Sequence, residues 1–445
     1  MTAYPLAPHR RLAGARAPAL PQTRDDSPLL TAALAIYTIG VMTISSFALT
    51  MLGFDYSDAG GNVLTKFHPT TLYLGVVLLL TAAGTGNPLG ALVHWLKESP
   101  AALAMGTAAT IAVAHAGLIS KIPVTAVIET FVPPAMLLLL LAKLPEQRGQ
   151  TLARLIHVIM LANATLAIGE YLTGWRLTPF VIDGENLNYE WRASALFGHP
   201  LANAMITGTY LVILGCGGGR DLSAPVRIAT FTLNFAAMTA FGGRGALVLL
   251  LVMLALLAGQ KVLAVLNGAR LDTRVMMGSI LALPAGLAAV LYLAHSNFFD
   301  KLLDRFANDT GSSQTRLDML ELFSHIPLKD LIFAPDPRQV ATWQTNFGLE
   351  RGIESFWLSM ALSYGLVVSF LVFAALFAHC WTIVQRCRPG AALPLVYFIA
   401  TATTSLSLAG KSSVLSIATL LVLVLMRPVP LPVVSLNRLY SARLR

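Results

Sequence analysis

Arg244 is the residue of this sequence whose type and position point most directly to chemistry. It follows Gly242 and Gly243 in a short turn between two long apolar runs. A charge in such a place is retained when it binds a ligand or reaches a polar surface, and glycines let a ligand approach the backbone closely. The planar guanidinium suits phosphate or carboxylate oxygens, which it binds through two parallel hydrogen bonds. We therefore expect an anion-binding site at Arg244.

More arginines gather in two long polar segments, at roughly 175–195 and 296–352. Loops of that length are usually functional or disordered. We take four of these arginines as candidates for substrate binding, and they are Arg192, Arg305, Arg338 and Arg351. The alternative is that these side chains bind lipid headgroups or carboxylates of the loops.

Arg316 opens a stretch with a helical pattern in the second loop. Leu317, Leu320 and Phe323 recur at helical spacing with charged residues on the other side. This pattern predicts a short amphipathic helix over 315–323 that lies on a membrane surface. We take Arg316 as a second candidate for binding a developing negative charge.

Two further residues stand at predicted helix entrances. His199 precedes Pro200, and a proline is tolerated in the first turn of a helix because its missing N–H has no partner there. Glu354 lies just after the long second loop, where a carboxylate serves either as a proton acceptor or as the partner of an arginine. For His199 the alternative is a purely structural hydrogen bond.

The elements that must position these residues are membrane helices. The chain has 445 residues, of which 56% are hydrophobic and only 12% charged, with a mean hydropathy of +0.68. Apolar runs of about 20 residues are long enough to cross a bilayer as helices, and their continuity excludes a β-barrel, which alternates every second residue. We therefore predict an all-α polytopic membrane protein with about twelve transmembrane helices.

Nine predicted spans precede the large loop at 296–352, and three follow it. The spans are expected at 28–53, 69–92, 100–119, 124–143, 152–174, 196–216, 226–242, 245–266, 275–295, 353–381, 392–409 and 411–427. A basic tail at 1–27 and a second tail at 428–445 flank them. The first span is too long for a cleaved signal peptide and should remain as an anchor.

The distribution of Lys and Arg orients the chain. The net charge of +9 could also suggest nucleic acid, but most basic residues fall in the segments that share a side with the amino terminus. Because cytoplasmic loops carry the excess of positive charge, we place both termini in the cytoplasm and expect no nucleic-acid partner. The three cysteines lie at or near cytoplasmic ends, so no disulfide is expected. No HExxH or zinc-type spacing occurs, and we expect neither metal nor cofactor.

The order of several short motifs resembles the O-antigen ligase and polysaccharide polymerase superfamily. Its residues are Gly198-His199-Pro200 followed by Asn203, the Arg244-Gly245-Ala246 turn, Thr315-Arg316 opening a loop helix, and Tyr364-Gly365-Leu366 in the tenth span. The likeness covers roughly residues 150 to 385. One departure is Glu354-Ser355, where ligases typically have a His-Asn pair, and it favours a polymerase.

The resemblance implies a bacterial inner-membrane enzyme that works at the periplasmic face. Such an enzyme takes a glycan from undecaprenyl diphosphate and passes it to an acceptor glycan, with membrane lipid around it and chain-length regulator or export proteins as further partners. Arg244 and Arg316 would correspond to the family's arginines, which would stabilise the leaving diphosphate. Glu354, or else His199, would act as general base.

Other functions remain open at this point. A ligase would transfer finished polymer to a lipid A-core acceptor. A transporter of lipid-linked oligosaccharide would use charges inside the spans, for which His115, Glu129, His157 and Glu170 are the candidates. A non-catalytic assembly partner in an export complex is the third alternative.

Overall fold

The part of the chain that the structure describes is mainly helical and contains one small hairpin. The computed structural model describes residues 28–56, 62–120, 122–179, 181–182, 185–186, 191–268, 300, 304, 312–349, 352–405 and 407–428. In the hairpin, β1 (Val181–Ile182) pairs antiparallel with β2 (Glu185–Asn186). The predicted all-α class is confirmed. Some predictions fall outside the described residues, namely those for the two tails, the ninth span at 275–295, Arg305 and Arg351.

The first half of the chain forms the helices α1 to α7. They are α1 (Pro28–Thr43), α2 (Ser46–Met51), the 3-10 turn η1 (Val63–Lys66), α3 (Pro69–Ala83), α4 (Pro88–Glu98), α5 (Pro100–His115), the π-turn η2 (Ala116–Ser120), α6 (Thr125–Lys143) and α7 (Glu146–Thr173). Several begin with proline, whose fixed φ and missing N–H suit the first helical position.

The second half contains the helices α8 to α18. They are α8 (Pro200–Gly215), α9 (Ala224–Phe241), α10 (Arg244–Leu266), α13 (Ser312–Ser324), α14 (Leu328–Phe333), α15 (Pro337–Asn346), α16 (Phe356–Arg386), α17 (Ala392–Ala402) and α18 (Val414–Leu425). The turn between α9 and α10 and the helix in the large loop occur where the sequence predicts them.

Within the described ranges, five helices are long and apolar enough to cross a membrane, namely α5 with its π-turn, α6, α7, α10 and α16. A sixth crossing is possible if α3 and α4 are one broken span, since they meet at 109°. The run predicted as one span at 69–92 is therefore two helices, and the run at 28–53 is divided between α1 and α2. Helices α1, α8, α17 and α18 are apolar but shorter.

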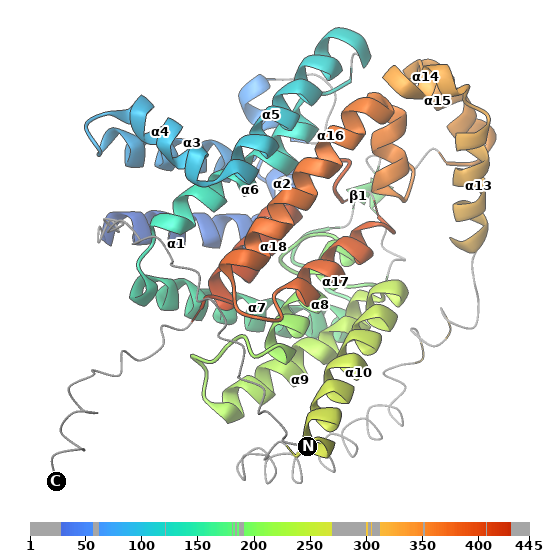
Figure 1. Cartoon of the computed structure of the whole chain (residues 1–445). Helices are drawn as coiled ribbons and strands as arrows, with labels where there is room; N and C mark the ends of the chain where they lie inside the picture. The colour runs from blue at the N-terminus through green and yellow to red at the C-terminus, as the bar shows by residue number, and fades with distance from the viewer. Residues whose placement is uncertain are drawn as a thin grey trace, which may run out of the picture.

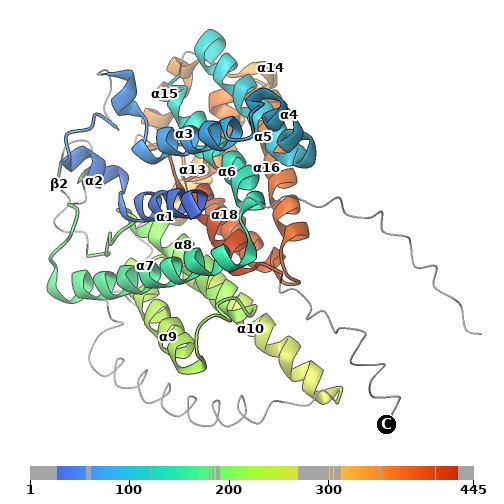
Figure 2. The same cartoon turned by 90° about the vertical axis from the view of Figure 1, so that its left-hand side faces the viewer.

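Helices α8 and α18 lie in the middle of the bundle, with other helices around them (Figures 1 and 2). Every residue of α18 is buried, and so are most residues of α8. The shortness of both helices agrees with this place, because a helix that is apolar on all sides and covered by neighbours is a core element.

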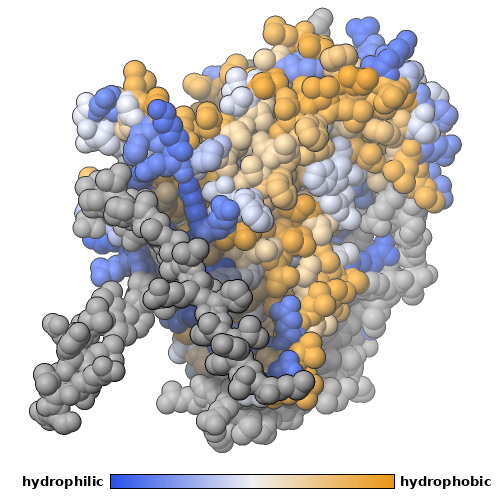
Figure 3. Space-filling model, viewed as in Figure 1, coloured by the Kyte–Doolittle hydropathy of each residue, from blue (hydrophilic) through white to orange (hydrophobic). Residues whose placement is uncertain are grey.

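Hydrophobic side chains dominate the outer surface of the bundle over α5 and α16 (Figure 3). Phe370 and Phe377 of α16 are each 70% exposed. In the most apolar 18-residue stretch of α10, only 11% of the residues are buried. A soluble protein rarely exposes so extended an apolar surface, so this surface is suited to lipid.

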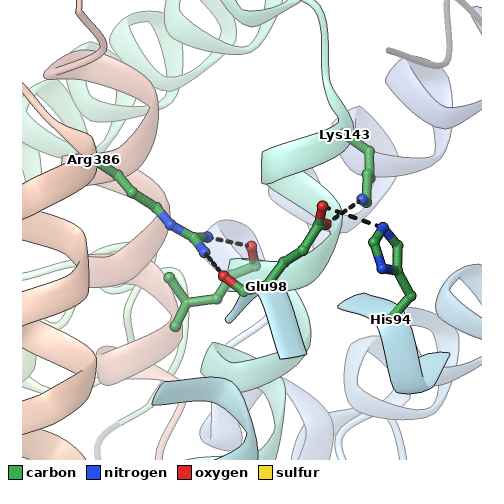
Figure 4. A network of polar contacts seen from close by, with 5 residues as sticks. His94, Glu98, Lys143 and Arg386 are labelled. Atoms are coloured by element: carbon green, nitrogen blue, oxygen red, sulfur yellow. Dashed lines mark hydrogen bonds and ion pairs between the residues drawn. The ribbon is translucent and has the colours of Figure 1, made fainter. Parts of the chain in front are cut away.

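Polar contacts join three helix ends on one side of the bundle (Figure 4). Glu98, at the end of α4, forms an ion pair with Lys143 Nζ at 3.1 Å, and its other carboxylate oxygen lies 3.2 Å from His94 Nε2. Arg386 donates to Leu138 O at 3.0 Å and to Glu98 O at 3.4 Å. The sequence predicts all three ends to be cytoplasmic, and the structure groups them together.

Candidate functional site

The loop at 191–199 and the turn between α9 and α10 pack directly against each other. Ala193 N donates to Ala240 O at 2.9 Å. A Cβ at Gly242 would lie 2.7 Å from Trp191 Cη2 and 2.9 Å from Arg192 Cγ, so the glycine lets the Arg192 side chain cross the turn. Gly242 also has φ +60°, which favours glycine. This contact brings Arg192 and Arg244, predicted from separate segments, to the same turn.

Buried Glu170 of α7 holds the loop in place. Its Oε2 accepts the N–H groups of Ser194 at 2.8 Å and Ala195 at 2.9 Å, and its Oε1 accepts Leu177 N at 3.0 Å. Ala195 has φ +39°, an uncommon conformation for a residue with a side chain. The carboxylate thus satisfies backbone groups of a loop that has no regular structure to bond to.

The segment from Gly198 to Asn203 builds the entrance of α8. Gly198 has φ +74°, and a Cβ there would lie 2.5 Å from Ser45 Oγ. Asn203 Nδ2 donates back to Ser194 O and to His199 O. Gly198 and Asn203 therefore shape the turn that holds His199. The pattern of residues alone did not indicate this role of the glycine and the asparagine.

His199 is the N-cap of α8 and is half-buried. Its Nδ1 accepts the N–H of Leu201 at 3.2 Å. A neutral imidazole has one acceptor and one donor nitrogen, so a ring whose Nδ1 accepts carries its proton on Nε2. In this arrangement the Nε2 of His199 is a hydrogen-bond donor. The bond from Leu201 N–H to Nδ1 is the structural hydrogen bond that the sequence left open as the alternative.

Helices α8 and α10 run side by side in the same direction. A Cβ at Gly243, which precedes α10, would lie 2.9 Å from Ala204 Cβ near the start of α8. At the other end, a Cβ at Gly215 would lie 3.1 Å from Leu257 of α10. Both helix N-termini therefore open at the same end, where unpaired N–H groups and the helix dipoles favour an anion.

We name Arg192, His199 and Arg244 the basic loop cluster. All three are half-buried, and they lie on adjoining segments at the shared N-terminal end of α8 and α10. Three donors of this type together with two helix N-termini can bind a phosphate or diphosphate group.

The other predicted site residues lie on the helices of the large loop and at the start of α16. Arg338 is exposed in the first turn of α15, whose N-cap Asp336 accepts Arg338 N at 2.9 Å. Glu354 is exposed, two residues before α16 begins. The backbone of Arg316 lies in α13, and its side chain is outside the described structure. The predicted site residues thus lie on two sets of elements, the large-loop helices with the start of α16 and the segments of the basic loop cluster.

Helix α13 has two apolar faces. Met319 and Leu322 are buried with Ile326, Leu331 and Leu362 in a small core that joins α13–α15 to α16. Leu317 and Leu320, which belong to the face predicted to lie on a membrane, are 60% and 58% exposed. The predicted helix is confirmed. Phe323, the third residue of the predicted membrane face, packs against this core, so only Leu317 and Leu320 of that face are largely exposed.

Each candidate for an ion path has local partners instead. Glu129 of α6 accepts His68 N at 3.0 Å and Thr71 Oγ1 at 3.0 Å. His115 Nε2 lies 2.7 Å from Phe333 O. Among the described residues, no hydrogen bond joins any two of His115, Glu129, His157 and Glu170. These four groups therefore support separate contacts between segments.

Loops near Glu129 meet around Lys411. Lys411 Nζ donates to Tyr56 O at 2.6 Å and to Lys66 O at 3.3 Å, and it lies 4.9 Å from the centre of the Tyr56 ring. Burial and the nearby charge of Lys66 lower the pKa of Lys411, while Glu129 acts against this. The sequence predicts all of these loops on the same side as the basic loop cluster.

Comparisons with known protein families, with curated proteins and with solved structures find no match to this chain. Its function therefore has to be argued from the geometry of the site. Among the described residues, no group of three or more His, Cys, Asp or Glu side chains could hold a metal ion. Arginine, histidine and helix N-termini are what the site offers, and these bind anions.

Proposed function

We propose that the chain is a membrane-embedded glycosyltransferase that polymerises oligosaccharide repeat units carried on undecaprenyl diphosphate. The observation that carries this proposal is that Arg192, His199 and Arg244 lie on adjoining segments at the shared N-terminal end of α8 and α10. The motif order resembling the O-antigen ligase and polysaccharide polymerase superfamily supports it. An exopolysaccharide or an O-antigen is the expected product.

In the proposed reaction a sugar hydroxyl of the acceptor glycan attacks C1 of the lipid-linked sugar. The bond from C1 to the diphosphate oxygen breaks, and the electron pair leaves with the undecaprenyl diphosphate. Arg244 and Arg192 neutralise the growing negative charge, and His199 donates a hydrogen bond from Nε2. Removal of one such preorganised donor from other enzymes raises the transition-state barrier by about 3–4 kcal/mol.

Glu354 is the proposed general base, which takes the proton of the attacking hydroxyl. His199 was the other candidate, but an imidazole whose Nδ1 accepts Leu201 N–H has its proton on Nε2 and is the better donor. Arg316 and Arg338, together with Arg305 and Arg351, would bind glycan or phosphate from the large loop.

The membrane arrangement that goes with this function has twelve crossings in the bacterial inner membrane. Both termini would be cytoplasmic, and the loop at 296–352 would be periplasmic. Besides the donor and the acceptor glycan, the partners would be membrane lipid and chain-length regulator or export proteins.

The test is the glycan profile of cells that carry Arg244→Ala as their only copy, with the membrane level of the protein measured alongside. We expect single repeat units to accumulate on the outer leaflet and long polymer to disappear. Arg244→Lys should retain part of the activity, because it keeps the charge and loses the planar fork. Arg227→Ala, on the distant end of α9, is the matched control and should leave the profile unchanged.

Other profiles would contradict a polymerase. Long polymer that stays lipid-linked identifies a ligase, and repeat units retained on the inner leaflet identify a transporter. Normal polymer from Arg244→Ala at normal protein level would remove the basic loop cluster from the reaction, and normal polymer from Glu354→Gln would remove the proposed base.

A further inference from the structure

A second concentration of arginine lies at the opposite end of α8 from the basic loop cluster. There the start of α7, the loop after α8, the loop after α16 and the end of α18 enclose a cavity of about 200 Å³. Arg220, Arg388 and Arg427 line it together with Glu146 and Asp221. We name it the arginine cavity.

Arg427 is fixed by the end of α6. Its guanidinium donates to Leu141 O at 3.3 Å and to Leu144 O and Pro145 O at 3.4 Å. A Cβ at Gly149 would overlap the Arg427 guanidinium in its present position, so the glycine leaves room for it on α7. The positive charge is thereby held at the wall of the cavity.

Arg388 is fixed in a similar way from the other side. It donates from Nε to Arg427 O and from Nη1 to Gly217 O at 3.4 Å. Burial and the positive charge of Arg220 lower the pKa of Arg388, and the carboxylates of Glu146 and Asp221 act against this. Two arginines thus lie close enough to repel each other, in a cavity that is partly shielded from water.

The carboxylate of Asp221 is already engaged. His157 Nε2 lies 3.3 Å from Asp221 Oδ1, and His157 Nδ1 lies 2.5 Å from Tyr210 Oη within the bundle. Burial acts to raise the pKa of Asp221, but the hydrogen bond and charge of His157 and the charge of Arg154 outweigh it and lower the pKa. Three guanidinium groups thus line the cavity with two carboxylates, of which Asp221 is also engaged by His157.

We propose that the arginine cavity binds the phosphate group of an anionic ligand. Contacts with backbone carbonyls fix the guanidinium groups of Arg388 and Arg427 at the wall of the cavity, and guanidinium groups suit phosphate oxygens. A volume of about 200 Å³ holds several waters of about 30 Å³ each, so a phosphate group fits. The phosphate comes either from the headgroup of an anionic lipid or from a soluble phosphate compound.

The place of the cavity agrees with both sources. The sequence predicts each segment that lines it to be cytoplasmic, and the apolar residues Val424 and Leu425 also contribute to its wall. A lipid of the inner leaflet would reach it from the bilayer, and a soluble phosphate would reach it from the cytoplasm. The proposal does not rest on the glycosyltransferase function, because the two sites lie at opposite ends of α8.

The test uses the full-length protein in nanodiscs and measures binding by calorimetry and by the thermal unfolding midpoint. One arm compares nanodiscs of phosphatidylcholine alone with nanodiscs that also contain phosphatidylglycerol, and the other arm adds pyrophosphate to phosphatidylcholine nanodiscs. Arg220→Gln is the main variant, since Arg220 is exposed and its loss leaves the carbonyl contacts of Arg388 and Arg427 in place. Arg148→Gln, exposed on α7 and outside the cavity lining, is the matched control.

We expect one of the two ligands to bind and to raise the unfolding midpoint. Arg220→Gln should weaken that binding about tenfold, the size of one charge-assisted contact, and Arg148→Gln should leave it within about twofold. An effect in the lipid arm alone assigns the cavity to a headgroup, and an effect of pyrophosphate assigns it to a soluble compound. The proposal is overturned if neither ligand binds or if the two variants weaken binding equally.

Discussion

Glu170 illustrates at the residue scale how a carboxylate in an apolar helix can organise a loop. Its three backbone partners, Leu177, Ser194 and Ala195, lie up to 25 positions away along the chain. The sequence marks Glu170 as unusual, since a charge in a span is expensive unless it is paired. It does not reveal the partners, because they are backbone groups of an irregular segment without any side-chain pattern.

We predict that Glu170→Gln destabilises the protein by about 1–3 kcal/mol, the range for leaving buried donors unsatisfied. Glutamine has only one acceptor oxygen. Its NH2 group, a donor, would therefore face the N–H donors of Ser194 and Ala195 or the N–H donor of Leu177. The thermal unfolding midpoint in detergent measures the change. Glu321→Gln, whose side chain is 60% exposed on α13, is the control and should unfold like the wild type.

A second consequence of Glu170→Gln concerns the proposed reaction. Release of the loop at 191–199 would displace Arg192 and His199 from the turn before Arg244. We therefore expect less polymer from this variant even at temperatures where it remains folded. Full polymer yield from a destabilised variant would show that the basic loop cluster does not need the Glu170 anchor.

Individual residues of the site were accessible to sequence reasoning, but their grouping was not. Arg192, His199 and Arg244 stand out because charged and titratable residues are scarce in this chain. Their convergence depends on the passage of Arg192 across Gly242 and on the contact between Gly243 and Ala204. Contacts between distant segments of this kind carry no local pattern.

At the scale of elements, α16 shows why an apolar run does not define a straight helix. The sequence predicts a span at 353–381, and the structure has one helix from Phe356 to Arg386 with a break at Gly365, where φ is 75° and ψ is 167°. A Cβ at Gly365 would lie 2.5 Å from Ala334 N and 2.6 Å from Phe333 C, so the end of α14 packs into the break. The segment that packs into the break lies about thirty residues earlier in the chain, and hydropathy does not report such a contact.

We predict that Gly365→Ala destabilises the contact between α14 and α16. The backbone at Gly365 is in a region that other residues adopt at a cost of about 1–3 kcal/mol, and the new methyl group would meet backbone atoms that cannot move aside separately. The expected result is a lower unfolding midpoint and faster proteolysis within α13–α15. Gly259→Ala on α10, where no atom lies within 4 Å of the new Cβ, is the matched control.

The outcome for Gly365→Ala separates two views of α13–α15. If proteolysis is unchanged while the unfolding midpoint falls, the small core around Leu322 and Leu331 suffices to hold these helices. If neither quantity changes, the break in α16 is not required for the packing of α14.

At the scale of the whole molecule, composition and hydropathy were enough to predict a helical membrane protein. They were not enough for the number of crossings, because central helices such as α8 and α18 are shorter than a bilayer is thick. Hydropathy also treats α3 and α4 as one run, whereas the chain turns between them by 109°. A helix enclosed by other helices and a helix surrounded by lipid have the same apolar composition, so the sequence does not tell them apart.

The structure does provide an independent view of sidedness. Segments predicted to be cytoplasmic meet in the network of Glu98, Lys143 and Arg386 and around the arginine cavity. Segments predicted to be outside meet at Lys411 and at the basic loop cluster. Because a charge-based rule and three-dimensional packing divide the loops in the same way, the orientation can be tested at a few exposed positions.

We predict that a membrane-impermeant maleimide labels Val63→Cys and Arg338→Cys in intact cells, and labels Arg148→Cys only after the membrane is opened. All three positions are exposed, with Val63 at 70%. The native cysteines should add little background, since all three are free but half-buried and burial raises the pKa of Cys387 to about 12, which leaves little reactive thiolate. Labelling of Arg148→Cys in intact cells with protection of the other two would invert the orientation and place the arginine cavity outside. Labelling of Val63→Cys and Arg338→Cys on opposite sides would contradict the assignment of these loops to one side of the membrane. The basic loop cluster and the large loop could then not act on one substrate.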